Sequence, residues 1–413
     1  MKKIFSFGLA FLLLAPALFA DDAKVMPALV GRFYIAPNFT IAPGAFDEDG
    51  KLENFDDGSV NVFNLGFALE FGVIDWITAA LQWVPGVTVW SDIKPALGGV
   101  VKGDVNTNGV GDLFLGAKLQ IVGATAPVKS NNVRFAAAPG VKIPLPGPDF
   151  EEEYKKFVKN QGGQSNDAVT FSSMDNHVFA AGGRFYFDYT LNDNFFINLY
   201  NETIFYPVKQ DLNKYGPYFA GLKSGLSALE PVMSGAEAFA PGITKAFNDI
   251  SGEVNYKNKI TFELEPVFST NLADGVVFTA GLPINYSYKP AYDFTLDINN
   301  VKNKTKTAKA AVDATLNSMT PDPNNPAYMG LATLQGGLEL AEGMLDEKTL
   351  LEMAGLEGKA SHALSINPGV SVFMMKLPLP LEFKLQYNIP VWGQETQARH
   401  TMAFQIRAYF AFR

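Results

Sequence analysis

The feature that most constrains this chain is a pair of long alternating segments near its N-terminus, residues 59–71 and 76–90. In the first segment one parity is apolar throughout: Phe63, Leu65, Phe67, Leu69 and Phe71. A period of two predicts strands with one apolar face. Both segments are about twelve residues long, which is more than the usual five or six of a soluble strand and close to what a tilted strand needs to cross a bilayer.

The first twenty residues have the pattern of a secretory signal peptide. A lysine pair is followed by the apolar stretch 4–14, and the small residue Ala20 precedes two aspartates. We expect cleavage after Ala20, so that 1–20 is a signal peptide and 21–413 the mature chain. The apolar stretch is too short for a spanning helix, and no later stretch has about 18 continuous apolar residues. Because the chain has no cysteine, it can be neither a lipoprotein nor stapled by disulfides.

Twelve strand-like segments follow along the mature chain without a linker between them. They are residues 29–39, 59–71, 76–90, 109–121, 133–143, 176–189, 195–206, 256–270, 276–288, 363–374, 381–389 and 401–412. Connections after the even-numbered segments are short and those after the odd-numbered ones are long, the longest being 207–255 and 289–362. This alternation is typical of an outer-membrane barrel with both termini in the periplasm. We therefore predict an all-β protein, a transmembrane antiparallel β-barrel of twelve to fourteen strands, with 292–298 as one possible addition.

Composition and motifs exclude several functions. Loss of the signal-peptide lysines takes the formal charge from −9 to −11, which disfavours nucleic acid as a partner. The sequence has no nucleophile elbow, zinc-protease motif or phosphate-binding loop, so we predict that the chain is not an enzyme and has no cofactor. His177, His362 and His400 lie near strand ends and are interpreted as polar rim residues. A calcium-loop-like segment at 104–112 has Leu115 where a bidentate glutamate is required, so no metal site is predicted.

The long loops contain amphipathic segments that predict helices at 222–250, 302–319 and 328–356. Apolar helix faces in an aqueous loop need something to cover. One interpretation is that these helices pack on one another as a plug. The other is a groove that collects hydrophobic ligands above the barrel, and its candidate residues are Leu226, Leu229, Met233, Phe239, Val312, Leu316, Leu334 and Leu338.

Proline and glycine interrupt several of the predicted strands. Pro85-Gly86, Pro139-Gly140 and Pro368-Gly369 lie within apolar runs, and Pro37, Pro266 and Pro283 add further interruptions. Proline cannot donate to the ladder, so such positions are found at bulges, kinks or strand ends. They are interpreted either as bulges that shape the barrel or, for Pro85 and Gly86, as a kink that opens a window in the wall.

These features together resemble the FadL/TodX family of outer-membrane transporters for long-chain fatty acids and other hydrophobic compounds. The strand and loop plan covers nearly the whole mature chain, and the segments VGRFYIAPNF and VFNLGFALEFGVIDWITAALQWVPG look like divergent members. The resemblance implies fourteen strands, an N-terminal hatch within residues 21–58, ligand capture between extracellular loops, and lateral release at a kink in the third strand. The family's Asn-Pro-Ala near the N-terminus is absent here.

We therefore expect passive uptake of long-chain fatty acids or other hydrophobic compounds across the bacterial outer membrane. Two alternatives stay open: a diffusion porin for polar solutes, and a surface adhesin or structural protein that acts through its loops. The porin would be lined by the opposite parity, at Glu70, Lys118, Lys142, Glu263, Glu265, Glu382, Lys384, Gln386 and Arg407. Expected partners are hydrophobic small molecules, outer-membrane lipid and the barrel assembly machinery, although Arg413 follows the aromatic Phe412 that this machinery usually reads at the C-terminus.

Overall fold

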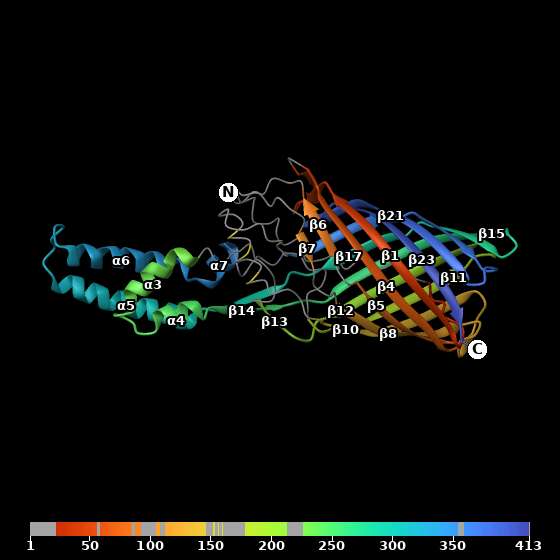
Figure 1. Ribbon diagram of the computed structural model, residues 1–413, viewed down its shortest axis with the longest axis horizontal. Helices are drawn as coiled ribbons and strands as arrows, with labels where there is room; N and C mark the ends of the chain where they lie inside the picture. Colours follow the sequence, from red (N-terminus) through yellow and green to blue (C-terminus); the bar gives the residue numbers. More distant parts are fainter. Residues whose placement is uncertain are drawn as a thin grey trace.

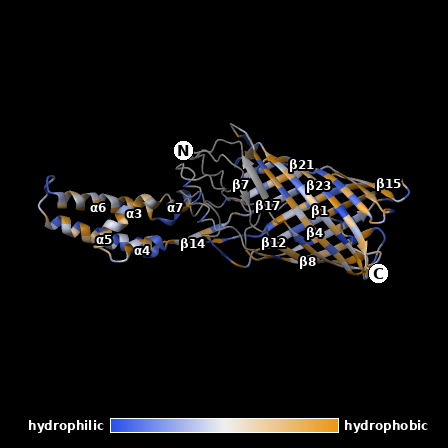
Figure 2. Ribbon diagram, in the orientation of Figure 1, coloured by the Kyte–Doolittle hydropathy of each residue, from blue (hydrophilic) through white to orange (hydrophobic). Residues whose placement is uncertain are grey.

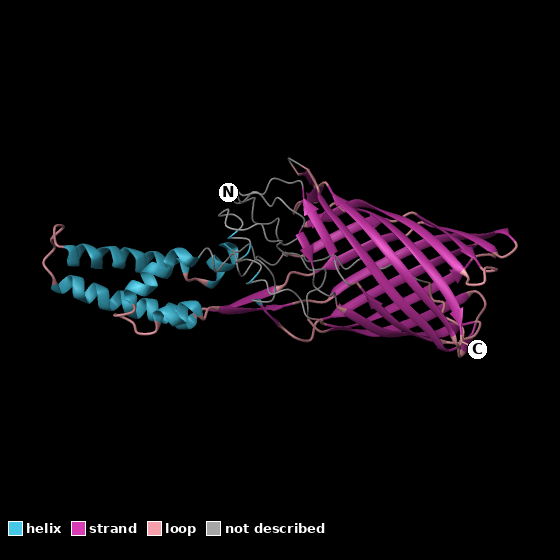
Figure 3. Ribbon diagram, viewed as in Figure 1, coloured by secondary structure: helices cyan, strands magenta, loops and turns pink. Residues whose placement is uncertain are grey.

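The computed structural model describes residues 22–55, 58–84, 87–91, 105–107, 112–145, 178–212, 226–353 and 359–412, with single positions at 152, 156 and 159. It consists of a β-barrel and a helical projection that extends from one end of it (Figure 1, Figure 3). The C-terminus lies at the opposite end of the barrel, where the short turns between strands also lie.

The barrel wall closes on itself through antiparallel pairing of β1 with β23. Among the described residues the wall has twelve positions, and each is filled by one strand or by two consecutive strands in line. They are β1 (Val30–Ala42), β4 (Val60–Ile74), β5 with β6 (Ile77–Trp83, Val87–Ser91), β8 (Leu113–Gly123), β10 (Val133–Ile143), β11 (Ala180–Thr190), β12 (Phe195–Phe205), β15 (Lys259–Ala273), β16 with β17 (Val276–Gly281, Ile284–Lys289), β19 with β20 (Ser361–Ile366, Gly369–Met374), β21 (Leu381–Gln394) and β23 (His400–Ala411). The predicted barrel is confirmed, and each predicted strand corresponds to one wall position.

Five short strands lie beside the wall strands or near them. They are β7 (Val105–Thr107) beside β6, β9 (Val128–Lys129) beside β8, and the small sheet of β2 (Gly44–Phe46), β3 (Leu52–Asn54) and β22 (Thr396–Gln397). The possible extra strand at 292–298 does form, as β18 (Asp293–Asp297), but it pairs with β14 outside the wall. The wall therefore closes with twelve strands in the described chain, and the implied fourteen are not found there.

The pleat of each strand separates an outward apolar face from an inward polar one. On β1, Phe33 is 38% exposed while its neighbour Arg32 is 6% exposed. On β11, Phe187 is 37% exposed and Asp188 only 1%. Because an unpaired edge is not tolerated in lipid, closure and an apolar outer surface together define a membrane-spanning barrel. Hydrophobic and hydrophilic positions alternate along the wall strands in Figure 2.

The helical projection stands on a three-stranded sheet of β13 (Gln210–Asp211), β14 (Ser251–Asn255) and β18. Its helices are η3 (Ser227–Leu229), α3 (Glu230–Ala236), α4 (Ile243–Asn248), α5 (Asn299–Ser318), α6 (Pro326–Met344) and α7 (Glu347–Met353). These helices fall in the segments where the sequence predicts loop helices, so that prediction is confirmed. No described helix combines the length and apolarity needed to cross a membrane.

Candidate lumen site

The N-terminal segment 22–28 lies inside the barrel and is held there by hydrogen bonds to inward-facing side chains. The main-chain N–H of Ala23 donates to both carboxylate oxygens of Asp188, at 3.1 and 3.0 Å. Gln120 donates from Nε2 to the carbonyl of Ala23 at 3.1 Å, and Ala23 is fully buried. Asp188 is fixed in turn by Arg134, whose Nε lies 2.7 Å from Oδ2. The segment is therefore anchored to β8, β10 and β11.

Two further contacts continue this anchoring toward the start of β1. Lys118 donates from Nζ to the carbonyls of Asp22 and Lys24, at 2.9 and 3.3 Å. The N–H of Met26 donates to Oγ1 of Thr78 at 2.7 Å. Since these bonds satisfy main-chain groups that would otherwise be buried without partners, the segment has a defined position in the lumen.

A glycine on β4 allows the segment to pass close to the wall. A Cβ added to Gly72 would stand 2.0 Å from the carbonyl oxygen of Pro27 and 2.6 Å from that of Met26. Any larger residue would push the segment away. The chain then turns into β1 at Leu29, whose φ of 61° is unusual for a leucine and whose N–H donates to the carbonyl of Gly72.

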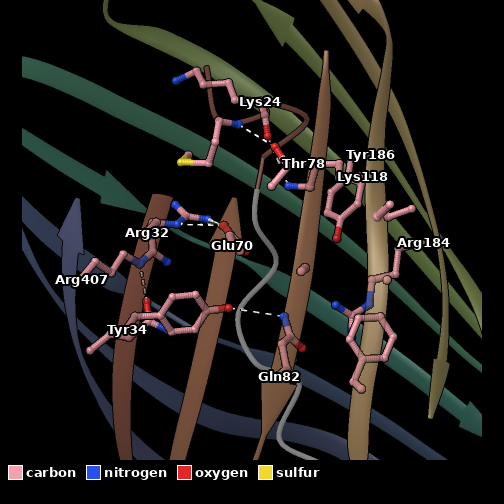
Figure 4. Close-up of a pocket in the computed structure, with 17 residues that line it drawn as sticks. Lys24, Arg32, Tyr34, Glu70, Thr78, Gln82, Lys118, Arg184, Tyr186 and Arg407 are labelled. Carbon is pink, nitrogen blue, oxygen red and sulfur yellow. Dashed lines mark hydrogen bonds and ion pairs between the residues drawn. The ribbon is translucent and has the colours of Figure 1, made fainter. Parts of the chain in front are cut away.

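A cavity lies beside this segment, between it and the wall strands (Figure 4). Its lining is Lys24, Met26, Arg32, Tyr34, Glu70, Thr78, Ala80, Gln82, Phe114, Gly116, Ala117, Lys118, Ala138, Arg184, Tyr186, Gln405 and Arg407. The room for it comes from small inward residues on three strands, Ala80 on β5, Gly116 on β8 and Ala138 on β10. At Gly116 a Cβ would already stand 2.9 Å from Phe114, so a larger side chain there would intrude on the cavity.

The charged groups around the cavity form ion pairs across neighbouring strands. Arg32 on β1 donates from Nε to Glu70 on β4 at 2.9 Å, and both side chains are buried. Arg407 on β23 lies 3.3 Å from Glu382 on β21. Removal of one partner of such a buried pair would leave an uncompensated charge, which costs far more than an exposed pair contributes. The pairs therefore fix the inward side chains in place.

A third pair completes this network on the opposite wall. Arg184 on β11 pairs through Nε with Glu202 on β12. Tyr200 donates from its hydroxyl to the same Glu202 oxygen at 2.9 Å. The guanidinium of Arg184 also lies over the ring of Phe114, 4.7 Å from its centroid, a distance at which a cation and an aromatic face attract.

The predicted porin lining faces the lumen. Six of the nine residues have less than a tenth of their surface exposed and lie on inward positions of their strands: Glu70, Lys118, Glu263, Glu265, Gln386 and Arg407. The other three, Glu382, Lys384 and Lys142, share the inward parity of β21 and β10. Sequence analysis missed Asp188, Arg184 and Tyr186 on β11. The same alternation would have found them, because Phe185 and Phe187 mark the outward parity of that strand.

The eight candidate groove residues lie in the core of the helical projection. Five of them are at most 2% exposed: Leu226, Leu229, Met233, Val312 and Leu338. Phe239, Leu316 and Leu334 are partly buried and pack against the same core. In this arrangement the side chains contact one another rather than line an open groove, and the helices pack together as a separate body outside the barrel, not as a plug within it.

The wall kink predicted at Pro85 and Gly86 falls outside the described residues, as do His177 and most of the calcium-loop-like segment. The described flanks show that the third wall strand is divided into β5 and β6. Both parts pair with β4, Trp83 opposite Phe67 and Val87 opposite Asn64. No cluster of three or more metal-ligating side chains occurs in the described chain.

A further set of interruptions crosses three adjoining wall positions, and we call it the proline seam: Pro266 on β15, Pro283 between β16 and β17, and Pro368 between β19 and β20. Single main-chain bonds bridge it. Leu282 donates to the carbonyl of Pro266 at 3.1 Å, and Asn367 to that of Pro283 at 2.8 Å. Beside it Gly281 and Gly369 pair with each other, and the side chains of Glu265 and Gln386 lie over these two glycines.

Comparison with known proteins supports the fold. No protein-family model matches the chain, and no curated protein matches it. The crystal structure of the COG4313 outer membrane channel from Pseudomonas putida F1 is 12% identical, covers 95% of this chain and 100% of its own, and gives a TM-score of 0.52. At this identity the likeness shows the fold alone. A closed barrel with an apolar outer face is the architecture of outer-membrane proteins, and this chain is an outer-membrane β-barrel.

Two other similar structures have lower scores. The CymD monoaromatic hydrocarbon channel is 9% identical, covering 94% of this chain and 90% of its own, with a TM-score of 0.31. A Pseudomonas aeruginosa FadL homologue is 11% identical, covering 93% and 90%, with a TM-score of 0.30. These scores are too low to support an argument about this chain. The outer-membrane barrel fold is shown, and the FadL/TodX resemblance with its specific features stays a prediction.

Proposed function

We propose that this barrel lets small hydrophobic compounds cross the outer membrane passively, entering from outside and leaving through the barrel wall. The observation that carries the proposal is the proline seam, a run of interruptions at one level of three adjoining wall positions. The chemistry of passage needs no catalytic group or cofactor, and we assign neither.

The seam supports lateral passage because each proline removes one N–H donor from the ladder. In the hydrocarbon core an unpaired main-chain group costs several kcal/mol, so a wall normally keeps every pair. Here the losses gather at one place, beside the glycine pair Gly281 and Gly369. Outside the wall the seam is flanked by exposed Leu282 and Val370, which present apolar surface to lipid. These losses lower the energy needed to part the strands at the seam.

The N-terminal segment supports the same route. It occupies the lumen near the short turns and is tied to the wall strands β8 and β11 by the bonds of Lys118, Gln120 and Asp188. A hydrophobic compound in the lumen therefore meets a polar, hydrogen-bonded obstacle on the direct path and an apolar exit at the side. Fatty acids as substrate, capture between extracellular loops and release at the third strand are the finer predictions of the FadL/TodX resemblance.

The test is uptake of a neutral aromatic hydrocarbon, such as toluene, into liposomes that contain the refolded barrel. Replacing Pro283 and Pro368 by Val restores two N–H donors and should slow uptake. The matched control is Pro139→Val on β10, which restores a donor on another part of the wall and should leave uptake unchanged. Equal uptake by liposomes with and without the barrel would overturn the proposal, and equal slowing by both variants would remove the seam as the exit.

A diffusion porin is the second candidate, and the inward charged parity favours it. Residues such as Glu263 and Glu265 give the lumen the polar lining of a water-filled channel. A porin would conduct ions with a steady open current and would admit small sugars into liposomes. Hydrophobic passage predicts low conductance, since the N-terminal segment and the ion pairs narrow the aqueous path.

A further inference from the structure

The cavity beside the N-terminal segment presents positive charge to the lumen. Among its ionisable lining residues Lys24, Arg32, Lys118, Arg184 and Arg407 are basic, and Glu70 is acidic. The carboxylates that pair with Arg184 and Arg407, Glu202 and Glu382, do not line it. These two carboxylates therefore balance the charges of the arginines without themselves lining the cavity.

Arg184 has the geometry of a carboxylate receptor. Its pairing with Glu202 uses Nε, and within the described chain its two terminal nitrogens have no protein partner. The side chain keeps about a fifth of its surface exposed, at 21%. Figure 4 shows it beside the cavity with Tyr186 above it on the same strand. A planar guanidinium with two parallel N–H groups matches the two oxygens of a carboxylate.

Lys118 supplies a second cation from β8. Its ammonium donates to the main-chain carbonyls of Asp22 and Lys24, which orient it. Nζ lies 4.3 Å from the centroid of the Tyr186 ring. Between β8 and β11 runs β10, whose residue in the cavity lining, Ala138, is small.

The rest of the lining combines aromatic and small apolar residues with the polar Thr78, Gln82 and Gln405. Tyr34, Phe114 and Tyr186 give ring surfaces, and Ala80, Gly116 and Ala138 leave the space between them. Ring surfaces beside polar groups that can fix a ligand's orientation are a feature of small-molecule sites. A bare inorganic anion would use the cations but leave the rings without a contact, whereas a neutral hydrocarbon would leave the cations without a counter-ion.

We propose that this cavity binds a compact organic acid, with its carboxylate on Arg184 and Lys118 and its apolar body against Phe114 and Tyr186. The proposal rests on the proposed function, because it names a class of compound that the barrel passes. It adds a resting point for that compound inside the lumen, next to the N-terminal segment.

The experiment uses the refolded full-length mature chain in planar bilayers, with benzoate as the probe and benzyl alcohol as its neutral counterpart. Benzoate should reduce the single-channel current saturably, and benzyl alcohol should not. The test variant is Arg184→Gln with Glu202→Gln, in which both charges of the pair are removed so that no buried carboxylate is left unpaired. Loss of the charge-assisted bonds should weaken benzoate block about tenfold or more.

The matched control is Lys142→Gln with Asp112→Asn. That pair also lies on the lumen side of the wall, at 3.6 Å, but outside the cavity lining, so block should be unchanged. Unaltered block in the Arg184 variant, equal block by benzyl alcohol, or equal block by phosphate at the same concentration would each overturn the proposal. If benzoate fails to block while toluene still enters liposomes, this inference fails and the proposed function stands. If toluene does not enter, the proposed function fails whatever benzoate does.

Discussion

Replacing Leu338 by Ala should unfold part of the helical projection without disturbing the barrel. Leu338 lies on α6 and is fully buried against the core that also contains Met233 and Val312. Next to it, a Cβ at Gly337 would stand 2.8 Å from Val232 on α3, so the two helices are in close contact and have little freedom to close a cavity. Leu→Ala changes at such sites cost about 2–5 kcal/mol, a large share of the stability of a small domain.

The assay is amide hydrogen exchange followed by mass spectrometry on the refolded barrel. If the amides of α6 exchange when the projection opens, the loss of about 2–5 kcal/mol in its free energy of unfolding raises their exchange rate about thirtyfold to several thousandfold. Peptides from β21 should exchange as before, because the barrel has its own hydrogen-bonded wall. The control is Leu340→Ala two residues away, where the side chain is 60% exposed and the expected change is within about 0.5 kcal/mol.

Equal effects of the two substitutions would refute this reasoning, because they would mean that burial in the core does not decide their cost. No effect of either would do the same. If Leu338→Ala left the projection folded and instead weakened binding of a fluorescent fatty acid, the groove interpretation would regain support.

Three further predictions follow from single contacts. Asp188→Asn weakens the anchor of Ala23 and the pair with Arg134, so the N-terminal segment should leave the lumen and single-channel conductance should rise. The N–H groups of Thr244 and Gly242 hold the pKa of Glu237 below its usual value. A lowered pKa means that the ionised Glu237 stabilises the folded state. This stabilisation is present above the pKa of the unfolded chain and is lost as pH falls through the lower pKa of the folded state. Acid should therefore increase amide exchange in α4, and Glu237→Gln should abolish this pH dependence. Phe185→Arg, on the outward face, should destabilise the barrel by about 2–4 kcal/mol, against about 0–1 for Tyr189→Arg near the strand end, as measured by urea unfolding in lipid vesicles.

The barrel could be predicted because the sequence pattern that specifies each wall strand lies within that strand. Each wall strand carries its own period of two, as in the outward Phe185 and Phe187 against the inward Tyr186 and Asp188 on β11. The alternation of short and long connections then orders the strands without knowledge of any long-range contact. The helices were also predictable, since α5 and α6 each repeat their apolar residues at helical spacing.

The inward position of Glu70, Lys118 and Arg407 could be predicted from the alternation, but the contacts of the site could not, because they depend on which segments meet inside the lumen. Nothing in the sequence around Ala23 indicates that its N–H meets Asp188, 165 residues away. The same limit applies to the helices, whose apolar faces are equally compatible with a groove and with a closed core. Only the packing of α3 against α6, where Gly337 lets Val232 approach, decides between them.

The polar lumen and the apolar exit together restrict which compounds suit this barrel. A pure hydrocarbon uses the apolar exit without using the charges of Arg32, Glu70 and Arg407, and a fully polar solute uses those charges without using the lipid-facing side of the proline seam. A compound with one charged end and one apolar end can use both, because the cavity cations orient the charge while the body stays near the rings of Phe114 and Tyr186. Protonation of such an acid on leaving Arg184 would then make it neutral enough to pass between the strands, so its uptake should quicken as the external pH falls toward the acid's own pKa.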